Sequence, residues 1–488
     1  MLALAVPPVA ADKGTIPAGA PRCPDLEEAA NAAFTAIEYI NLRRLPLMLR
    51  PDPARVLVRP FLPASEPRRP GQPDPARALV QPMLPSTEPN YAGPTEPCRI
   101  TRATHRVLAM DPIQVEAELA DVMRDFGSRH AGLHATFADR FVQVRGIIPT
   151  LPAVPEEARQ LLIGAYFSLE YSYEAAALFN PSMVPHPDQD GLAPGEVRFV
   201  LSLRATGEGH VSSICFRSGT VDAGGNLRLD PPGVHATTPH WNSPVQADGG
   251  CEVAFPPGSL LAERVLFPIT PKQRNGLEDA RFVRFVEDDG AATYYATYTA
   301  YSGHEIVPEL LQTSDFQRFR FVPIQGDAVR NKGMALFPRR IGGQYVMLAR
   351  LDGENLQLSR SDDLRTWNSV ETVFGPAESW EFLQIGNCGS PIELPEGWLV
   401  LTHGVGSMRR YSIGATLLDL HDPTRVLARL RTPLLSPDAQ EREGYVPNVV
   451  YSCGGMVHAG RLILPYGMSD TATAFAVTPL RSLLAAMS

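Results

Sequence analysis

Apolar residues recur with two different periods along the chain, and the change of period divides it. Between residues 99 and 190 they recur every three to four positions, which is the spacing of an amphipathic helix. The clearest case is the segment 111–126, where Pro112 suits the first helical turn. A second helix is predicted from residue 155 to about residue 179, with Glu170 and Glu174 one turn apart on a solvated or locally paired face. We expect a helical module without catalytic groups of its own.

From residue 191 to the end, short runs rich in β-branched and aromatic residues alternate with Gly, Asp and Pro turns. A strand–turn–strand unit recurs at 198–217, 279–301, 335–350, 389–404 and 455–467. Recurring hairpins are typical of β-propellers, whose blades pack against their neighbours around a central channel, whereas a β-sandwich would show less internal repetition. The sequence therefore predicts a mainly β fold, with a five-bladed β-propeller over residues 191–488.

Residues 1–98 form a third region, which is rich in proline and contains a near-duplicate. The stretch Pro-Asp-Pro-Ala-Arg-Val-Leu-Val-Arg-Pro-Phe-Leu-Pro at 51–63 recurs as Pro-Asp-Pro-Ala-Arg-Ala-Leu-Val-Gln-Pro-Met-Leu-Pro at 73–85. Two copies are too few for a solenoid. Because proline removes backbone donors and breaks helices, we expect a proline-rich arm, with one short helix at 26–42, that wraps a surface or pairs with another subunit.

The composition narrows the class of partner and the compartment. A net charge of −9 and a pI of about 5.7, without a basic stripe, argue against a nucleic-acid partner. No apolar run is long enough to span a bilayer and the N-terminal apolar stretch lacks a basic n-region, so we expect a cytoplasmic protein without a membrane partner. The six cysteines lack metal-ligand spacing, which predicts reduced, mostly buried thiols.

The most polar motif of the β region is Asn-Gly-Leu-Glu-Asp-Ala-Arg at 275–281. It places Glu278, Asp279 and Arg281 where a loop enters a predicted strand, a usual place for chemistry. Taken alone, this cluster is most simply a salt-bridged turn. In a propeller, however, the loops at one end of the inner strands converge on the axis. Residues far apart in the sequence but at equivalent positions of different blades can therefore meet there.

Such positions carry a set of charged and polar side chains. They are Arg204 and His210 in the first predicted blade, Glu278, Asp279 and Arg281 in the second, Lys332 and Arg350 in the third, Gln384, His403, Arg409 and Tyr411 in the fourth, and Asp470 in the fifth. Each alone has a structural explanation, because a strand-terminal Arg commonly pairs with an acid and a lone His is usually structural. The recurrence of such residues at one blade position favours a shared site.

The chemistry of this set is typical of a sugar site. It offers one carboxylic acid, several cations and the aromatic rings of Trp380, Tyr345 and Tyr411. The acid can protonate a leaving glycosidic oxygen. A second catalytic carboxylate is less obvious, whereas Arg, Lys and His side chains suited to a phosphate are easily assembled.

Several motifs occur in unbroken order over roughly residues 195 to 485. They include Gly-Leu-Glu-Asp-Ala-Arg at 276–281, Leu-Phe-Pro at 336–338, Trp-Glu-Phe-Leu-Gln-Ile-Gly at 380–386, Gly-Trp-Leu-Val-Leu-Thr-His-Gly-Val at 397–405, Tyr-Ser-Ile-Gly-Ala-Thr-Leu-Leu-Asp at 411–419, Gly-Tyr-Val-Pro-Asn-Val-Val at 444–450 and Tyr-Gly-Met-Ser-Asp-Thr at 466–471. This series resembles the signature motifs of glycoside hydrolase family 130, the β-mannoside phosphorylases and β-mannosidases.

The resemblance implies a five-bladed propeller and an anomer-inverting reaction that needs no metal and no cofactor. Asp279 would be the acid and would pass its proton through a hydroxyl of the bound mannose. The implied phosphate-binding residues are Lys332 (or its neighbour Arg330), Arg350, His403 and Tyr411. The implied substrate-binding residues are Arg204, Glu278, Arg281, Gln384 and Asp470.

One position departs from the family's phosphorylases, because Gln384 stands where they have a lysine. Losing a charge-assisted contact would weaken the anion site by about 1–3 kcal/mol. The family's hydrolases instead recruit a carboxylate base for water, and three residues could serve here: Glu381, Glu393 and Glu443. The retained Arg350, His403 and Tyr411 favour an inverting phosphorylase that cleaves β-mannosides with inorganic phosphate to mannose 1-phosphate.

Two alternatives and one structural expectation remain open. The first alternative is an inverting β-mannosidase using water, and the second is a non-catalytic sugar-binding propeller. The N-terminal additions fall outside the shared motifs, and we expect them to act in homo-oligomer formation or acceptor selection. The segment 166–180, which precedes the first predicted blade, could close the pocket over an oligosaccharide substrate.

Overall fold

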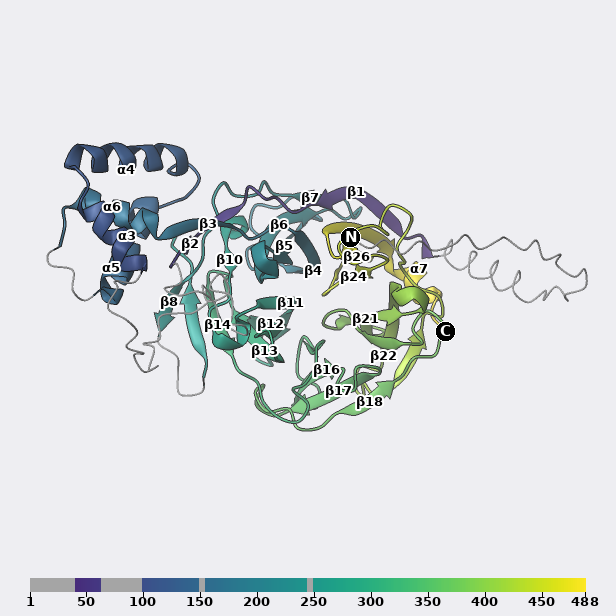
Figure 1. Ribbon diagram of the computed structural model, residues 1–488. Helices are drawn as coiled ribbons and strands as arrows, with labels where there is room; N and C mark the ends of the chain where they lie inside the picture. Colours follow the sequence, from purple (N-terminus) through teal and green to yellow (C-terminus); the bar gives the residue numbers. More distant parts are fainter. Residues whose placement is uncertain (1–39, 63–98, 149–153, 244–248) are drawn as a thin grey trace, which may run out of the picture.

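The computed structural model describes residues 40–62, 99–148, 154–243 and 249–488. Four β-sheets stand around a common axis in a ring (Figure 1). The largest sheet has eleven strands and supplies two blades, which are joined where Gly276 pairs in parallel with Ser212. The fold is therefore the five-bladed β-propeller that the recurring hairpins predict. Each predicted hairpin forms two paired strands of a different blade.

The blades follow one another along the chain, and the first strand of each lies on the axis side, as β11 does in Figure 1. The first blade contains β4 (Ala177–Pro185), β5 (Val197–Thr206), β6 (Ser212–Val221), β7 (Leu227–Leu229) and β10 (Val265–Leu266). The second contains β11 (Gly276–Val286), β12 (Ala292–Tyr301), β13 (Ile306–Thr313) and β14 (Arg318–Val322), extended by β9 (Cys251–Ala254) and β8 (His240–Ser243). The third contains β15 (Ala335–Leu336), β16 (Tyr345–Ala349), β17 (Leu356–Ser361) and β18 (Glu371–Phe374). The fourth contains β19 (Gln384–Asn387), β20 (Ile392–Leu394), β21 (Gly397–Val405), β22 (Tyr411–Leu418) and β23 (Val426–Arg429). The fifth contains β24 (Val450–Tyr451), β25 (Met456–His458), β26 (Arg461–Met468) and β27 (Ala472–Pro479), followed by α7 (Leu480–Ala485).

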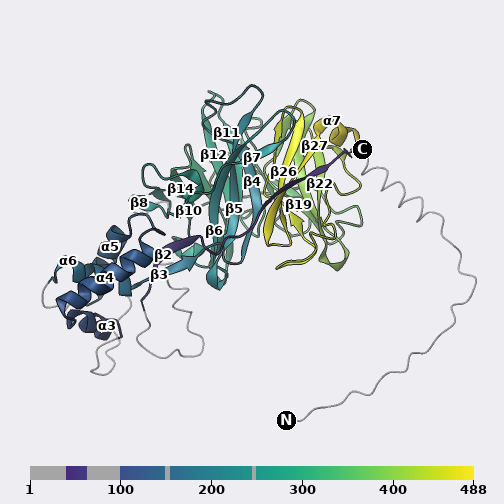
Figure 2. The same cartoon turned by 90° about the horizontal axis from the view of Figure 1, so that it is seen from above.

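The N-terminal region completes the fifth blade. β1 (Arg43–Leu49) pairs antiparallel with β27 and forms the outer edge of that sheet, and Figure 2 shows it running along the outside of the ring. β2 (Val56–Pro60) lies within the first copy of the duplicated stretch and pairs with β3 (Ser168–Ser172). The second copy at 73–85, and residues 26–39 of the predicted N-terminal helix, lie outside the described residues.

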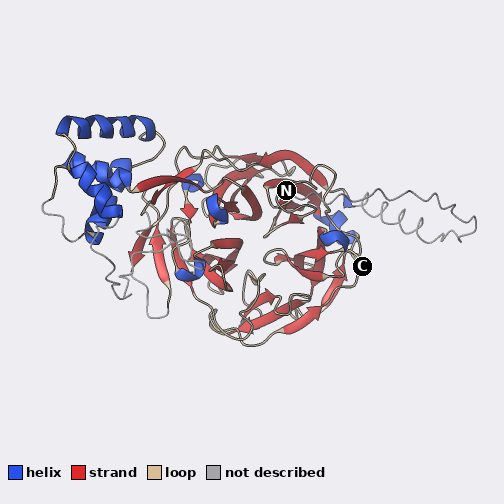
Figure 3. Ribbon diagram, viewed as in Figure 1, coloured by secondary structure: helices blue, strands red, loops and turns tan. Residues whose placement is uncertain are grey.

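A helical module stands beside the propeller (Figure 3). It contains α3 (Arg99–Leu108), α4 (Pro112–Phe126), α5 (Leu133–Ile147) and α6 (Glu157–Tyr166). α4 occupies the predicted segment, and it begins at a capping box in which Asp111 accepts from the backbone N–H of Ile113 at 2.9 Å while Gln114 reaches back to the backbone of Asp111. The prediction of a helix at this position is confirmed.

The second predicted helix is wrong beyond residue 166. α6 ends at Tyr166, and the following residues form β3 and β4. β4 is buried along nearly its whole length, and a continuous apolar run does not distinguish a strand from a buried helix. The first strand of the propeller therefore begins at Ala177, ahead of the boundary expected at residue 191.

Glu174 lies in a buried ion-pair cluster and not on a solvated helical face. Its side chain is fully buried, and its Oε1 lies 2.8 Å from Nη2 of Arg217 and 3.3 Å from Nε of Arg55. Arg55 also donates to the hydroxyl of Tyr173 and to the carbonyls of residues 233 and 262. The first copy of the duplicated stretch is thereby fixed to the first blade.

The remaining expectations concern cysteines and membranes. Cys215, Cys251, Cys388 and Cys453 are buried and form no disulfide, whereas the other two cysteines lie outside the described residues. Among the helices that the structure describes, none is long and apolar enough to cross a membrane.

Candidate active site

The axis-side ends of the strands enclose a cavity of about 210 Å³. Its lining consists of Asn180, Arg204, Asp279, Lys332, Arg350, Gln384, His403, Arg409, Tyr411, Val446, Val449, Tyr451 and Asp470. All blades contribute to it. Of the residues to which the family resemblance gives a catalytic or binding role, all line the cavity except Glu278 and Arg281, which are close to Asp279 in the chain. His210, from the set of equivalent blade positions, does not line it. The convergence expected of equivalent blade positions is therefore present.

A β-bulge turns Asp279 toward the cavity. In the pairing of β11 with β12, Glu278 lies opposite Thr299 and Arg281 lies opposite Thr297, so one extra residue is inserted in β11. Asp279 adopts φ 51°, a left-handed conformation that Asp tolerates better than most residues. Backbone strain of this kind is concentrated at functional sites.

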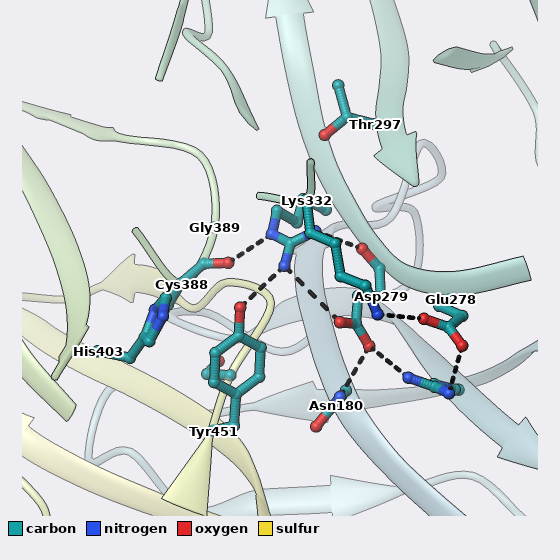
Figure 4. Close-up of polar contacts among 12 residues, drawn as sticks. Asn180, Glu278, Asp279, Thr297, Lys332, Cys388, Gly389, His403 and Tyr451 are labelled. Atoms are coloured by element: carbon teal, nitrogen blue, oxygen red, sulfur yellow. Dashed lines mark hydrogen bonds and ion pairs between the residues drawn. The ribbon is translucent and has the colours of Figure 1, made fainter. Parts of the chain in front are cut away.

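The carboxylate of Asp279 is held by three partners (Figure 4). Its Oδ1 accepts from Nδ2 of Asn180 at 2.7 Å and from Nη1 of Arg204 at 3.3 Å, and its Oδ2 lies 3.9 Å from Nη2 of Arg281. Burial alone would raise the pKa of Asp279, but the nearby positive charges outweigh it and hold the pKa well below its usual range. Asp279 is therefore ionised when the cavity holds no ligand.

Arg281 orients Asp279 from behind. Its guanidinium is 2% exposed and donates to the carbonyls of Cys388 and Asp279, both at 2.9 Å, and to the hydroxyl of Tyr451 at 2.8 Å. These bonds join the second, fourth and fifth blades at the axis. Arg281 thus supports the site and does not line it.

Glu278 joins two of the predicted cations. Its Oε1 accepts from Nη2 of Arg204 at 2.8 Å and its Oε2 accepts from Nζ of Lys332 at 2.7 Å. Lys332 is therefore already paired with a carboxylate, although it still lines the cavity.

Arg350 has no such partner. Among the described residues no carboxylate lies within ion-pair distance of its guanidinium, and its buried Nε has no hydrogen-bond partner. Its Nη1 lies 2.7 Å from Nε2 of His403, and its pKa is lowered by burial. A half-buried guanidinium without a carboxylate and with an unused donor is suited to binding an anion.

His403 is neutral beside Arg350. Burial, and then the charges of Arg350 and Arg281, lower the pKa of His403 well below its usual value. Its Nδ1 lies 3.2 Å from the carbonyl of Asn387, so Nδ1 carries the hydrogen and Nε2 accepts from Arg350. A Cβ on Gly386 would lie 2.8 Å from Cε1 of His403, which explains a glycine at this position.

Gln384 contacts both Arg350 and His403, at the position where the family's phosphorylases have a lysine. Its amide is best oriented with the nitrogen donating to the carbonyl of Gly353 and the oxygen accepting from Arg350. Gln384 therefore holds the Arg350 side chain without adding a charge.

Asp470 is the second carboxylate of the cavity. It follows Ser469 in a turn where both residues have positive φ, at 51° and 46°. Burial, and then the charge of Asp279, raise the pKa of Asp470 to about 6, although Arg204 and Arg409 oppose the shift. The surroundings therefore lower the pKa of Asp279 and raise the pKa of Asp470.

Sequence reasoning missed four residues of the lining, Asn180, Val446, Val449 and Tyr451. Asn180 has φ 48° and stands on β4, whose first three residues fall within the predicted second helix. The Asn-Pro dipeptide at 180–181 is a turn signal that could have marked this position. Within the segment 166–180, Asn180 is the residue that reaches this cavity, whereas Tyr166 lines a separate apolar cavity in the helical module.

Of the predicted aromatic platforms, Tyr411 alone lines the cavity, with its ring parallel to that of His403. Tyr345 is buried against Arg340 and Glu287, and Trp380 donates to the carbonyl of Arg431. Arg409 lines the cavity, whereas His210 stacks on Tyr445 with ring centroids 5.6 Å apart.

None of the three proposed bases for water lines the cavity. Glu381 is fully buried and pairs with Arg429. Glu393 pairs with Arg339 on the surface, and Glu443 is exposed. The cavity therefore offers phosphate-binding groups more readily than a base for water.

Comparison with known proteins identifies the family. A sequence model described as β-1,4-mannooligosaccharide phosphorylase, for glycoside hydrolase family 130, matches residues 259–488. The 1,2-β-oligomannan phosphorylase of Thermoanaerobacter sp. (strain X514) is 35% identical over 231 residues, which cover 46% of this chain and 75% of that protein. The chain belongs to glycoside hydrolase family 130.

Other members of family 130 show the same extent of similarity. The β-1,2-mannobiose phosphorylase of Listeria innocua is 35% identical over 219 residues, covering 43% of this chain and 59% of that protein. Its solved structure with β-1,2-mannobiose aligns with 64% of this chain and 92% of that chain at a TM-score of 0.46 and 27% identity. The family 130 match begins at residue 259, so the N-terminal arm, the helical module and most of the first blade lie outside it.

Proposed function

We propose that this family 130 enzyme is an inverting phosphorylase that cleaves β-mannosides with inorganic phosphate to give α-mannose 1-phosphate and a shortened sugar. Its relatives include phosphorylases named for β-1,2- and β-1,4-linked mannosides. The observation that carries the proposal is Arg350, a half-buried guanidinium that has no carboxylate partner among the described residues and lines the cavity with Asp279.

The phosphate would lie between the third and fourth blades. Arg350 supplies the unpaired charge, Tyr411 supplies a hydroxyl, and Lys332 can share its ammonium between Glu278 and the ligand. The neutral His403 offers Nε2 once Arg350 turns toward phosphate. A dianion bound to a desolvated guanidinium is favoured by charge-assisted hydrogen bonds.

Asp279 is the proposed acid, and the proton it needs has a source within the reaction. Monohydrogen phosphate attacks the anomeric carbon, the bond to the glycosidic oxygen breaks, and the proton of the phosphate ends on the leaving sugar. Asp279 relays this proton, through a hydroxyl of the bound mannose as the family resemblance implies. Bound phosphate also offsets the cations that keep the pKa of Asp279 low, so substrate binding favours the protonated acid.

Hydrolysis is the less favoured alternative because it needs a carboxylate to activate water. Inverting hydrolases hold such a base on the face of the sugar opposite the acid, with room for the water between. Glu381, Glu393 and Glu443 do not line the cavity, and its second carboxylate, Asp470, takes the sugar-binding role that the family resemblance implies.

The deciding experiment incubates the protein with β-1,2- and β-1,4-mannobiose, with and without inorganic phosphate. Phosphorolysis predicts mannose 1-phosphate only when phosphate is present, and no product from Asp279→Asn. Free mannose formed equally well without phosphate would overturn the proposal in favour of hydrolysis. Product from neither sugar under either condition, with binding retained, would favour a non-catalytic propeller.

A further inference from the structure

The N-terminal strand contacts a loop that helps to build the cavity. We define the rim loop as residues 436–449, the second part of the connection from β23 to β24. Two of its residues, Val446 and Val449, line the cavity, and its Tyr445 is 63% exposed and stacks on His210. The loop therefore forms part of the fifth-blade side of the site, next to Asp470.

Hydrogen bonds join the rim loop to the turn that carries Asp470. The hydroxyl of Ser469 donates to the carbonyl of Glu441 at 2.6 Å, and the N–H of Ser469 donates to the carbonyl of Val449 at 2.8 Å. The N–H of Tyr445 donates to the hydroxyl of Thr471 at 3.0 Å. Because these bonds flank Asp470 on both sides, its position depends on the position of the rim loop.

Arg44 of β1 is bound to the rim loop through Glu441. Its Nε donates to Oε1 and its Nη2 to Oε2 of that carboxylate, each at 3.0 Å, in a bidentate pair. Nη2 also donates to the carbonyl of Ser436 at 2.7 Å. Glu441 is 4% exposed and accepts further bonds from the hydroxyl of Tyr466 and the N–H of Asp438.

Glu441 is therefore a buried carboxylate whose principal positive partner comes from the N-terminal arm. Removing that partner would leave a buried charge with only neutral donors, which is unfavourable unless the carboxylate turns toward solvent or becomes protonated. Either response moves the backbone that Ser469 holds. Arg44 lies outside the part of the chain that matches the family.

We propose that Arg44 is a positioning residue for the sugar-binding side of the cavity: through Glu441 it fixes the rim loop and, with it, Asp470. This inference rests on the proposed function for the identity of the ligand. Among the described residues, Arg350 and Lys332 of the third blade form no hydrogen bond with the rim loop. Tyr411 is the phosphate-side residue that does contact it, because its backbone N–H donates to the carbonyl of Asn448 at 3.0 Å.

Steady-state kinetics of Arg44→Met test the inference, with mannobiose and phosphate varied separately. We expect KM for mannobiose to rise about tenfold, equivalent to one lost charge-assisted contact, and KM for phosphate to rise less, because Arg350 and Lys332 do not contact the rim loop. Arg43→Met is the matched control, since Arg43 is the exposed neighbour on the same strand. Arg44→Lys should recover part of the loss because it restores the charge without the bidentate geometry.

The double variant Arg44→Met/Glu441→Gln separates positioning from simple strand stability. The neutral amide removes the buried unpaired charge while it can still accept from Tyr466, so KM for mannobiose should return to within about threefold of the wild type. If KM is unchanged in Arg44→Met, or if the double variant is no better than the single one, the inference is wrong.

Hydrogen exchange supplies a readout that does not depend on activity. In Arg44→Met, amide exchange should accelerate in residues 438–449 and 469–471 and stay unchanged in residues 345–361 of the third blade. Unchanged exchange in the rim loop overturns the inference. If the wild type cleaves no mannoside, the proposed function fails, yet exchange still tests whether Arg44 holds the rim loop.

Discussion

Arg350 donates through Nη1 to Nε2 of His403 across 2.7 Å, and the histidine is kept neutral by the same guanidinium and by burial. The pair joins the third and fourth blades at the axis. Gln384 accepts from Arg350 on its other side, so the arginine is oriented entirely by neutral groups. Its charge remains available to an anion.

The substitution Gln384→Lys should therefore strengthen phosphate binding. A lysine Nζ beside Arg350 adds a second cation to the proposed anion site, and a gain of about 1 kcal/mol would lower KM for phosphate several-fold. Initial rates at varied phosphate check this, with Gln384→Met as the uncharged control. If lysine and methionine raise this KM equally, then the bond from Gln384 to Arg350 matters more than local charge.

Asp279→Asn should abolish turnover while the protein stays folded. The amide can still accept from Asn180 but cannot carry a proton to the leaving oxygen, and loss of a general acid typically costs about 10²–10⁴ in rate. Mannose 1-phosphate formation and thermal unfolding are measured together. Glu393→Gln, which alters a surface pair with Arg339, is the control and should retain activity. Turnover above a tenth of wild type in Asp279→Asn would contradict the assignment.

The fold and most of the cavity lining could be predicted because the blades repeat. Each hairpin carries its own turn and strand signals, so five of them could be found independently. Arg350 and His403 could be matched because they stand in repeated blade contexts near family motifs. Where the same hairpin recurs in every blade, the local sequence and the order of the motifs are enough to predict the fold and most of the cavity lining.

Long-range partners could not be predicted in the same way. β3 pairs with β2 more than a hundred residues earlier, and β4 is buried without alternation, so neither strand has a local signature. Asn180 was missed with β4. The bond between Arg44 and Glu441 spans 397 positions, and two charged residues in a sequence do not reveal that they meet.

Asp470 should make stability depend on pH. Its folded pKa of about 6 lies above the value near 3.9 expected for an unfolded aspartate, so the folded protein binds this proton more tightly. Ionisation of Asp470 therefore destabilises the fold as pH rises from about 4 through about 6. Asp470→Asn removes this cost, and its Tm relative to wild type should be higher at pH 7 than at pH 4.5.

The control for this pH dependence is Asp288→Asn, because Asp288 is exposed. The Tm difference between this variant and the wild type should be the same at both pH values. A difference for Asp470→Asn that does not change with pH would show that the carboxyl group is not held at a raised pKa.

Glu174→Gln should destabilise the protein strongly, because it breaks a buried ion pair from one side. Arg55 and Arg217 would both lose the one carboxylate with which they pair among the described residues, at a site where Glu174 is fully buried, which typically costs about 3–5 kcal/mol. Glu170→Gln is the matched control on the adjacent strand, where the partly exposed pair with Arg129 contributes about 1 kcal/mol or less. Denaturant midpoints of the two variants distinguish these values, and equal midpoints would mean that the buried cluster does not anchor the N-terminal arm.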